Sequence, residues 1–429
     1  MTATTANGAS QPGEVNANAA ALAAMRQADP GSRVARRHEA KLFRASQRVF
    51  WCFNMYARWR RKDIVKVPFL GYAINGAVTV REALLDAERF PNTNSKPDTV
   101  LVTQLVGPQS LTNQNGEPHK QLRLQLQDLF TPKYVRELCD RVLTPVMDDV
   151  RDALLRGETV DVSRWARIIT GTIVMSMNGE HLSGAERDER AMELTEIGRE
   201  IANMVPARLK AVGDKRVDHA NTLVDRLIVG VRETYEAGDE GTIPGRMKAR
   251  GIPWEVARGL IVVLILGGTE TTQSGSARIA AMLHDTNQWP VLRADHSLVD
   301  NAMDEGLRAC TPVPIITRWV AEDCEFHGVR MKKDRLVVTF LNNAVRDRRV
   351  IENGGHFDIT RRIPRELRLL NFGAGPHFCL GYNLAKREIG MMLETLLSLP
   401  REVEVVDRTY ADAVLMPAYK HLMIRMKPA

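Results

Sequence analysis

The residues with the clearest chemical potential lie in one loop near the C-terminus of this 429-residue chain. A single cysteine, Cys379, stands in the run Asn-Phe-Gly-Ala-Gly-Pro-His-Phe-Cys-Leu-Gly over residues 371–381, directly before a segment with helical spacing. Glycines allow backbone conformations and close approaches that other residues forbid. A thiol where a helix begins lies at the positive end of the helix dipole, which favours the thiolate. The loop is therefore predicted to hold a sulfur anion against something flat or metallic.

Three roles are open to Cys379. An isolated cysteine is most often a small buried hydrophobic residue. A catalytic thiol would need a base and a third group that orients this base. His377 lies two residues away, but no orienting group is evident in the sequence. For a cysteine taken alone the buried hydrophobic role ranks first; the six matched positions of the pattern described next put metal ligation ahead, because glycine and cysteine are uncommon at fixed offsets by chance.

The pattern Phe-Gly-x-Gly-x-His-x-Cys-x-Gly resembles the haem-binding loop of the cytochromes P450, and it is complete at Phe372, Gly373, Gly375, His377, Cys379 and Gly381. The resemblance implies that the Cys379 thiolate is the axial ligand of haem b (iron protoporphyrin IX), where its electron donation favours O–O cleavage. Backbone amides from Gly375 to Gly381 are expected to tune the sulfur.

A second motif lies in the segment from Pro253 to about Asp285, which is expected to form one long helix. Gly267 and Gly268 interrupt its apolar run, and each costs about 1 kcal/mol relative to alanine inside a helix. Such a cost indicates close packing or the approach of a ligand. The Thr271 hydroxyl can bond the carbonyl four residues earlier, which bends a helix and leaves backbone groups free for water.

The stretch Gly-Gly-Thr-Glu-Thr-Thr over residues 267–272 resembles the oxygen-activation motif of the same family. The resemblance implies that Gly267 adjoins the haem and that Glu270 and Thr271 deliver protons during dioxygen activation. Adjacent residues point about 100° apart around a helix, so a relay between these two would run through water. The alternative is that Glu270 is a surface charge and Thr271 only a capping hydroxyl.

Glu305 and Arg308 are spaced i, i+3 and share a helix face. An exposed pair of this kind contributes only a few tenths of a kcal/mol. In the family that the chain resembles, this Glu-x-x-Arg pair is buried and joined by a second arginine, which corresponds here to Arg361. These residues are expected to be structural and to hold the cysteine loop. The spacing from Arg361 to Cys379 is a few residues longer than in typical bacterial members.

The two propionates of a buried haem need cationic partners. His119 and Arg123 share a helix face at i, i+4 and resemble the family's His-x-x-x-Arg. Arg318 and His377 correspond to two further propionate partners. Each of the four taken singly is equally well explained as a solvated base.

The remaining chain predicts a mainly α protein with small β-sheets, which agrees with the cytochrome P450 fold, a helix-rich triangular prism. Residues 1–25 are expected to form a disordered tail and residues 26–429 a single haem domain. Apolar residues recur with helical spacing in Arg136–Leu155, Ala191–Met204, Leu223–Tyr235 and Leu384–Leu397. Short strand-like runs occur at Phe69–Ile74, Phe326–Met331 and Leu336–Phe340.

The chain is 44% hydrophobic and 26% charged, an ordinary balance for a globular protein. Its five cysteines are scattered without a Cys-x-x-Cys spacing, which argues against a disulfide framework, a zinc site or an iron–sulfur cluster and favours the cytoplasm. No signal peptide is expected. The longest apolar run, Leu260–Leu266, is too short to cross a bilayer, which takes about 20 residues.

The net charge is +7 and the isoelectric point about 9.2, which would suit nucleic acid, an anionic membrane or an acidic protein. The aromatic and arginine-rich segment Trp51–Lys62 is the best candidate for membrane or nucleic-acid binding. We interpret it instead as an amphipathic helix with its aromatic residues inward and its arginines in water. No nucleic-acid-binding motif accompanies it.

By resemblance the protein is a monooxygenase that inserts one atom of O2 into a hydrophobic molecule such as a terpenoid, steroid, fatty acid or polyketide. Because only 50 residues follow Cys379, a fused reductase is not expected after it. Electrons are expected from NAD(P)H through a ferredoxin reductase and an acidic ferredoxin. The ferredoxin would dock on a basic face made of Arg362, Arg365, Arg368, Lys386 and Arg387. A peroxide-driven oxygenase or an isomerase on the same scaffold, or a non-enzymatic haem sensor, is the alternative.

The expected substrate pocket is aliphatic and nearly free of charge, and we assign to it Val102, Leu264, Gly267, Val313 and Ile315. Many such residues are simply core in any protein. The sequence does not identify the substrate.

Overall fold

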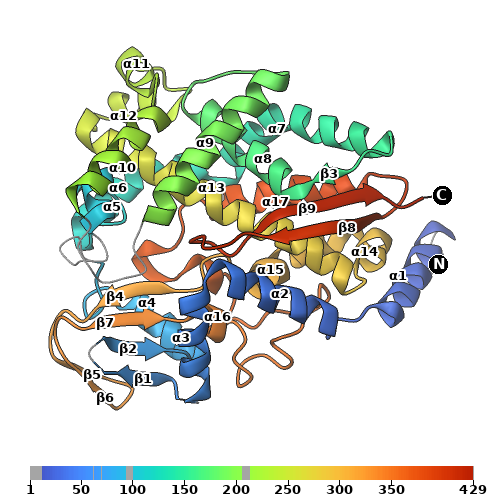
Figure 1. Ribbon diagram of the computed structural model, residues 1–429, viewed down its shortest axis with the longest axis horizontal. Coiled ribbons are helices and arrows are strands. Elements are labelled where there is room, and N and C mark those ends of the chain that lie inside the picture. Colours follow the sequence, from blue (N-terminus) through green and yellow to red (C-terminus); the bar gives the residue numbers. More distant parts are fainter. Residues whose placement is uncertain (1–11, 61, 69, 93–99, 205–212, 429) are drawn as a thin grey trace, which may run out of the picture.

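The computed structural model describes residues 12–60, 62–68, 70–92, 100–204 and 213–428. Its longest element is α13 (Trp254–Asp285), a 32-residue helix that runs through the middle of the molecule (Figure 1). Pro253 is its N-cap residue, a position where a missing backbone N–H costs no helical hydrogen bond. The long helix predicted from Pro253 to about Asp285 is therefore confirmed.

Four short strands form the main sheet, in the order β1 (Ile64–Val67), β2 (Gly71–Ile74), β7 (Leu336–Thr339) and β4 (Ile316–Trp319). The strands β2 and β7 pair in parallel, and the two outer pairs are antiparallel. A Cβ atom on Gly71 would lie 2.0 Å from the Leu336 carbonyl oxygen, so only glycine lets the two backbones pair at this point. The helices α4 (Ala77–Leu85) and α16 (Leu341–Ala344) and the hairpin of β5 (Cys324–Phe326) and β6 (Val329–Met331) lie at the same end of the molecule (Figure 1).

Helices make up the opposite side of the molecule (Figure 1). The helix α8 (Val162–Met177) is buried along most of its length, because its apolar residues contact both α9 (Gly184–Met204) and α13. The helices of this part are α5 (Val100–Val106), α6 (Gly116–Leu126), α7 (Pro132–Leu155), α8 (Val162–Met177), α9 (Gly184–Met204), α10 (Asp214–Leu227), α11 (Val231–Ala237) and α12 (Ile243–Ala249).

The C-terminal third contains the cysteine loop and the helix that joins this loop to α13. The helix α17 (Tyr382–Leu397) follows the loop directly and packs on α7, α13 and α15 (Val299–Cys310). The other elements of this part are α14 (Trp289–Ala294), α15 (Val299–Cys310), β8 (Val403–Tyr410) and β9 (Tyr419–Met426), the last of which also pairs with β3 (Val160–Asp161). Short 3₁₀ turns lie at Gln127–Phe130, His296–Leu298, Leu370–Phe372 and Gly375–His377.

The observed elements confirm a mainly α fold with small β-sheets and correct two local predictions. The predicted helix Leu223–Tyr235 is two helices, because α10 ends at Leu227 and Gly230 adopts a left-handed φ of 76° before α11 begins. The predicted strand Phe326–Met331 is a hairpin, since His327 and Gly328 both have positive φ and reverse the chain between β5 and β6. A short apolar run does not reveal a turn of this kind.

The prediction of a disordered tail over residues 1–25 is wrong from Pro12 onward; residues 1–11 lie outside the described residues. α1 (Pro12–Gln27) packs against α14 and buries Ala21 and Ala24. Alanine has the highest helix propensity, and here small side chains let two helices approach closely. The alanine-rich composition of this segment therefore belongs to a helix that packs on its neighbour.

Two further N-terminal helices, α2 (Arg33–Ser46) and α3 (Arg48–Trp59), lie beside the main sheet (Figure 1). The prediction that the segment Trp51–Lys62 turns its aromatic residues inward holds only in part. Phe53 packs against Phe340, but Tyr56 and Trp59 are exposed. Within the described part of the chain, no helix is both long and apolar enough to cross a membrane.

Candidate active site

The cysteine loop is shaped by two glycines with left-handed backbone conformations. Gly373 has a φ of 84° and Gly375 a φ of 71°. A Cβ atom on Gly375 would lie 2.5 Å from the Leu84 carbonyl oxygen, so this position requires glycine for space as well as for φ. The Cys379 N–H donates a hydrogen bond of 3.0 Å to the Phe372 carbonyl, which closes the loop. The sulfur is thereby fixed between a tight turn and the start of α17.

The surroundings of Cys379 differ from those of the other buried cysteines. Burial raises the pKa of the Cys379 thiol, while a hydrogen bond from the Gly381 backbone N–H and the charge of Arg123 lower this pKa. Burial also raises the pKa of Cys139 and Cys310, two free cysteines that pack in the apolar core. Cys379 thus has a backbone donor and a nearby cation that stabilise a thiolate, and a bound metal ion would supply the remaining charge.

Four basic side chains, His119, Arg123, Arg318 and His377, gather on the same side of the loop. His119 on α6 is buried, and its ring lies 4.3 Å from that of His377, centroid to centroid. Burial, which is the largest cause, and the charges of Arg318, His119 and Arg123 together lower the pKa of His377 to about 3. Burial also lowers the pKa of Arg318 to about 10. Among the described residues, no carboxylate pairs with Arg123 or Arg318.

Such an arrangement of mutually repelling, desolvated bases is costly unless anions neutralise it. The cluster therefore fits a ligand that carries carboxylate groups. It brings together residues from α6, from β4 and from the cysteine loop, as the sequence predicted for His119, Arg123, Arg318 and His377.

Two asparagines that the sequence analysis missed position His377. Asn92 Nδ2 lies 3.2 Å from His377 Nδ1, and Asn115 Oδ1 lies 3.3 Å from His377 Nε2. Asn115 also donates to the Asn92 carbonyl at 2.7 Å. Neither asparagine belongs to a recognisable motif, so only the folded chain reveals the contact.

α13 leaves space beside its two adjacent glycines. A Cβ atom added to Gly267 or Gly268 would meet nothing within 4 Å, so these glycines are not required by packing between protein atoms. The Thr271 hydroxyl donates a 2.7 Å hydrogen bond to the Gly267 carbonyl, as the spacing predicted. Open space on this face of the helix is what a bound ligand would need.

Glu270 is a buried carboxyl group rather than a surface charge. It is 8% exposed, and its Oε1 atom has no hydrogen-bond partner among the described residues. Burial raises its pKa to about 7, while the charges of Arg199 and Arg167 oppose this rise. Both arginines instead pair with Glu196, Arg167 at 2.6 Å. Glu270 can therefore gain or lose a proton near neutral pH.

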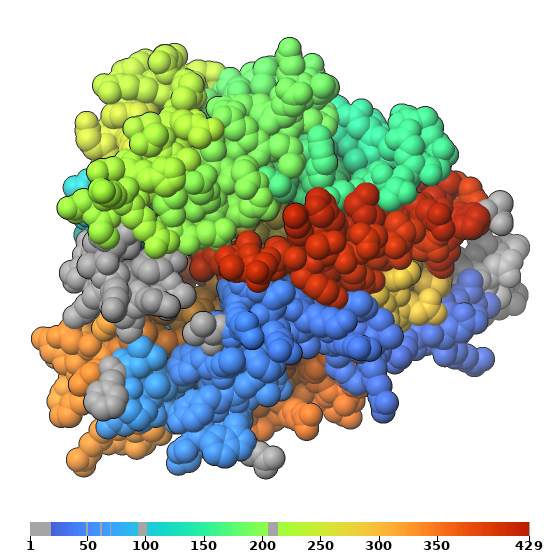
Figure 2. All heavy atoms as spheres, viewed as in Figure 1, coloured from blue at the N-terminus to red at the C-terminus, as the bar shows by residue number. Residues whose placement is uncertain are grey.

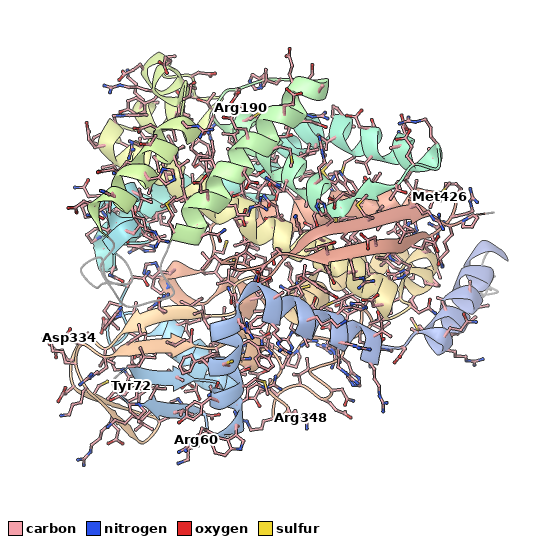
Figure 3. The ribbon with its side chains drawn as sticks, in the orientation of Figure 1. Arg60, Tyr72, Arg190, Asp334, Arg348 and Met426 are labelled. Atoms are coloured by element: carbon pink, nitrogen blue, oxygen red, sulfur yellow. The ribbon has the colours of Figure 1, made fainter. Side chains whose placement is uncertain are left out.

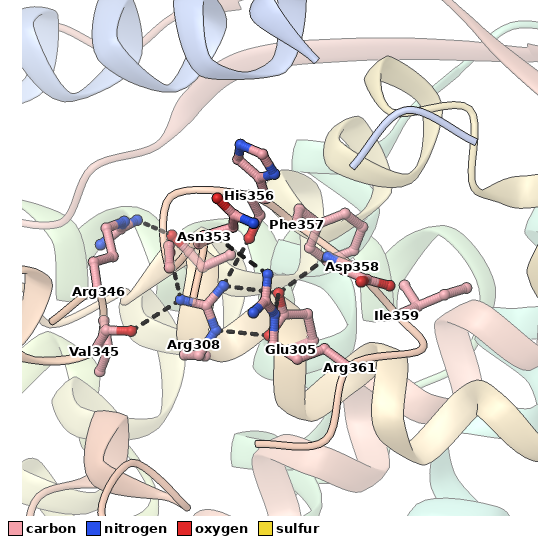
Figure 4. Close-up of polar contacts among 12 residues, drawn as sticks. Glu305, Arg308, Val345, Arg346, Asn353, His356, Phe357, Asp358, Ile359 and Arg361 are labelled. Carbon is pink, nitrogen blue, oxygen red and sulfur yellow. Dashed lines mark hydrogen bonds and ion pairs between the residues drawn. The ribbon is translucent and has the colours of Figure 1, made fainter. Parts of the chain in front are cut away.

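The pair Glu305–Arg308 on α15 is fully buried and is the centre of a larger network (Figure 4). Arg308 donates to both Glu305 carboxylate oxygens, at 2.6 and 2.7 Å. Its remaining N–H groups donate to the carbonyls of Val345, Gly354 and His356. All charges and donors of this pair are thus matched inside the protein, which a buried ion pair requires.

Arg361 joins this network, as predicted despite the unusual spacing to Cys379. Its Nε atom lies 3.3 Å from Glu305 Oε1, and its other nitrogens donate to the carbonyls of Glu352 and Asn353. The Asp358 backbone N–H also donates to Glu305, at 3.0 Å. One carboxylate therefore fastens the long segment that leads from β7 to the cysteine loop onto α15 (Figure 4).

Of the residues assigned to the substrate pocket, Gly267 is exposed and the four apolar side chains are half-buried. Val102 belongs to α5, Leu264 and Gly267 to α13, and Val313 and Ile315 to the segment between α15 and β4. A hollow of about 960 Å³ lies elsewhere, between α7, α15 and α17. Its lining mixes apolar residues with the charged side chains of Arg136, Asp304, Arg368, Lys386 and Arg387.

Glu388 on α17 is a further buried acid that the sequence analysis missed. It is 3% exposed and shares a hydrogen bond with Thr272 on α13. Burial raises its pKa to about 8. In the sequence it occupies one polar position within an otherwise apolar helix face, which is the only signal that could have pointed to it.

We expect Glu388→Gln to stabilise the protein increasingly as pH rises. Below its unfolded pKa of 4.5 this group is protonated in both states and contributes no penalty. Between 4.5 and about 8 only the unfolded state releases the proton, so wild-type stability falls, at about 1.4 kcal/mol per pH unit. Urea unfolding at about pH 5 and about pH 8 measures this difference. Equal effects of the variant at both pH values would contradict it; the exposed Glu137→Gln on α7 is the control.

Known proteins provide the comparison for this site. The family model "Cytochrome P450" matches residues 291–413, which contain Glu305, Arg308, Arg361 and the whole cysteine loop. A cytochrome P450 of Bacillus subtilis is 28% identical over 302 residues, covering 67% of this chain and 69% of the relative. A steroid C26-monooxygenase of Mycobacterium tuberculosis is 26% identical over 369 residues, covering 80% and 90%.

The chain belongs to the cytochrome P450 family. Its fold agrees: the crystal structure of P450BioI bound to a fatty-acyl carrier protein superposes with a TM-score of 0.75, at 23% identity, over 87% of this chain and 97% of that one. The P450 family consists of haem enzymes, and the relatives matched over most of this chain include monooxygenases. This P450 is therefore an enzyme of the monooxygenase class.

The residues of this P450 fit a haem. The cations Arg318 and Arg123, which have no carboxylate partner among the described residues, match the two propionates. The open space beside Gly267 and Gly268 matches a flat ligand, and the Gly381 N–H and Arg123 stabilise an anionic sulfur at Cys379. Cys379 would bind the iron, and His119, Arg123, Arg318 and His377 would bind the propionates. The loop residues Phe372, Gly373 and Gly381 would line the sulfur side of the group.

Proposed function

We propose that this P450 inserts one atom of O2 into a hydrophobic small molecule, as a haem-thiolate monooxygenase that receives electrons from a separate ferredoxin. The observation that carries the proposal is the acid–alcohol pair of α13, in which Glu270 is buried with a pKa near 7 and Thr271 turns its hydroxyl onto Gly267. Haem, when bound, supplies the activation of dioxygen. Residues 26–429 act in this proposal as one haem domain.

The protein's own contribution is to hold the group and to supply protons. Cys379 would hold the iron of the haem and supply electron density to it, and the Gly381 N–H would moderate this donation by its hydrogen bond to the sulfur. Glu270 stores a proton because burial keeps its carboxyl partly neutral at pH 7. Thr271 and water carry the proton from there, since adjacent helix residues do not face each other. A general acid works best when its pKa lies near the working pH.

We expect Glu270→Gln to lower product formation by about 10²-fold while electron consumption from NAD(P)H continues. The amide keeps the size of the side chain but can no longer transfer a proton. Product yield per NAD(P)H consumed measures the effect, and the pH dependence of this yield near neutrality should disappear. Glu255→Gln, an exposed change in the first turn of the same helix, is the matched control. An unchanged yield in Glu270→Gln would exclude the relay.

The substrate class that we propose is hydrophobic, of the terpenoid, steroid, fatty-acid or polyketide type, and hydroxylation is the expected outcome. The aliphatic residues Val102, Leu264, Val313 and Ile315 support it, and a steroid C26-monooxygenase is among the relatives. Difference spectra of the haem protein across a small library of hydrophobic compounds, followed by product analysis with a ferredoxin system, test the proposal. Turnover with peroxide alone and none with ferredoxin would support a peroxide-driven enzyme instead. Spectral binding without any turnover would support a sensor.

The proposed ferredoxin site is smaller than the basic face inferred from sequence. Arg362, Arg365 and Arg368 are exposed, and the described residues offer them no acidic partner. Lys386, in contrast, pairs with Asp304 at 2.8 Å. Arg387 pairs with Asp140 at 2.6 Å and Glu394 at 3.0 Å. We therefore propose the three free arginines as the docking charges, because paired cations attract an acidic partner less strongly.

We expect the double variant Arg365→Glu and Arg368→Glu to reduce the rate of haem reduction by an acidic ferredoxin at least tenfold at low salt. Charge reversal replaces attraction by repulsion and mainly affects the association rate. Stopped-flow reduction at several salt concentrations measures it, with Lys215→Glu on α10 as control. Rates that are unchanged and insensitive to salt would place the docking site elsewhere.

The five cysteines, all of them free, support a cytoplasmic location for the protein.

A further inference from the structure

α3 carries two apolar stripes, and only one of them is buried. The inner stripe includes Phe50, Phe53 and Ala57, and both phenylalanine rings pack on Phe340 at centroid distances of 5.4 and 5.3 Å. This spacing of i, i+3 and i+7 is that of an ordinary surface helix with one face in the core. The inner stripe alone therefore packs α3 on the rest of the protein, and the opposite face of the helix is not needed for this packing.

The outer stripe repeats the same spacing in Cys52, Met55, Tyr56 and Trp59. Cys52 is exposed, and Met55, Tyr56 and Trp59 are 47%, 38% and 73% exposed. The rings of Tyr56 and Trp59 lie 6.4 Å apart and form one continuous apolar ridge. Scattered apolar residues on a surface need no explanation, but a second complete helical stripe indicates a binding face.

The segment around this stripe holds an unusual share of the positive charge. Residues 33–62 contain eight arginines, two lysines and one acidic residue, a net charge of +9, whereas the whole chain carries +7. The single acid, Glu39, points inward and pairs with the buried Arg278 at a nitrogen–oxygen distance of 2.5 Å. Among the described residues of this segment, no arginine or lysine forms an ion pair. Figure 2 shows that α2 and α3, in blue, occupy one part of the open surface.

Neighbouring segments extend this positive surface. Arg60 and Arg348 lie along the same edge of the molecule (Figure 3). Burial and the charge of Arg348 lower the pKa of Arg58, which shows that these cations repel one another without a compensating acid. Arg44 lies over the ring of Trp51, 5.7 Å from its centroid, and so stays at the border of the apolar stripe.

We propose that the outer face of α2 and α3 docks the protein on the surface of an anionic lipid membrane. In this geometry Met55, Tyr56 and Trp59 enter the boundary between headgroups and acyl chains, and the arginines and lysines around them contact lipid phosphates. An apolar stripe flanked by basic residues is the pattern of a helix that lies in the membrane plane. Tryptophan and tyrosine are enriched at this depth because their rings are partly apolar and partly polar.

The chemistry of the face favours lipid over the two other anionic partners. A nucleic-acid duplex would neutralise the cations, but it would leave the ridge of Met55 and Trp59 without an apolar environment. An acidic protein could cover the ridge, yet the three free arginines near the cysteine loop already form the proposed site for such a partner. A uniformly anionic plane with an apolar interior satisfies both the charge and the stripe.

Docking in this way would also bring lipid close to the proposed substrate pocket. The inner stripe of α3 packs in the same apolar cluster as Ile315, which we assigned to the pocket wall. A hydrophobic substrate dissolved in the membrane could therefore enter beside α3. This consequence rests on the proposed function; membrane binding itself does not, and the experiment below involves no turnover.

The test is sedimentation of the full-length haem protein with vesicles of phosphatidylcholine alone or of phosphatidylcholine mixed with phosphatidylglycerol. We expect at least tenfold tighter binding to the mixed vesicles and loss of this preference at high salt. Two variants separate the contributions: Arg60→Glu with Lys62→Glu removes attraction, and Met55→Ser with Trp59→Ser removes the apolar ridge. Each should weaken binding at least tenfold, while the haem spectrum stays that of the wild type.

The matched control is Arg164→Glu with Lys215→Glu, an equal charge change at exposed positions of α8 and α10, which should bind vesicles as the wild type does. Three results would overturn the proposal. One is equal binding to neutral and anionic vesicles. The second is full vesicle binding by Met55→Ser with Trp59→Ser, together with equally tight binding to duplex DNA, which would indicate a general polyanion surface. The third is weakening of the same size in the control variant.

Discussion

In Cys379→Ser the reduced, carbon-monoxide-treated protein is expected to lose its red-shifted thiolate absorption band completely. A serine hydroxyl is far less acidic than a thiol and does not supply the soft anionic ligand that gives this band. The loop itself should persist, because its shape depends on Gly373, Gly375 and the hydrogen bond from the Cys379 backbone N–H to Phe372. The difference spectrum of the reduced protein with and without carbon monoxide measures the change.

A matched control is available in Cys324→Ser, a free and partly exposed cysteine on β5. This variant should keep the full band. Survival of the band in Cys379→Ser would mean that another residue binds the iron, and loss of the band in both variants would point to general destabilisation. Haem content, measured on the same samples, distinguishes a changed ligand from a missing cofactor.

The second large effect is expected at Glu305. Glu305→Gln should lower the free energy of unfolding by about 3–5 kcal/mol, because it leaves Arg308 and Arg361 as buried charges without a counter-charge. A loss of this size is a large fraction of the stability of a typical domain. Guanidinium unfolding of the haem protein measures it, and less haem should be retained after purification, since the network fastens the segment that leads to the cysteine loop.

Asp148→Asn is the matched control for Glu305→Gln. Asp148 pairs with Arg151 on α7 with the same i, i+3 spacing, at 3.0 Å, but both side chains are at least 40% exposed. Its loss should change stability by less than about 1 kcal/mol. Equal effects of the two substitutions would show that burial adds nothing to the Glu305 pair. A small effect at Glu305 alone would mean that water enters the site and solvates the arginines.

The elements set by contacts close in sequence were predictable. The turn at Gly373 and Gly375, the i−4 hydrogen bond of Thr271 and the span of α13 all depend on residues within a few positions of one another. Glycine, threonine and proline restrict the backbone in known ways, so their spacing carries this information. The same logic failed at Gly230 and His327, where one residue with positive φ interrupts an otherwise regular run.

Other features depend on which segments meet. No spacing rule relates Asn92 to His377, or α1 to α14, because long stretches of chain separate them. The raised pKa of Glu270 and of Glu388 is caused by burial, a property of the packed interior that no local pattern encodes. The outward position of Trp59 likewise follows from which face of α3 the Phe340 cluster occupies.

The sequence by itself therefore determined the mainly α class, and it predicted Cys379 as the ligand and Glu270 and Thr271 as the acid–alcohol pair, through residues whose local geometry is restrictive. Only the tertiary structure decided that Glu270 is buried with its Oε1 atom unpartnered among the described residues, that two of the five predicted docking cations are already paired, and that α3 presents a second apolar stripe to the outside. The physical reason is the range of the forces involved. Backbone preferences act over a few residues, whereas desolvation and charge pairing depend on every segment that packs nearby.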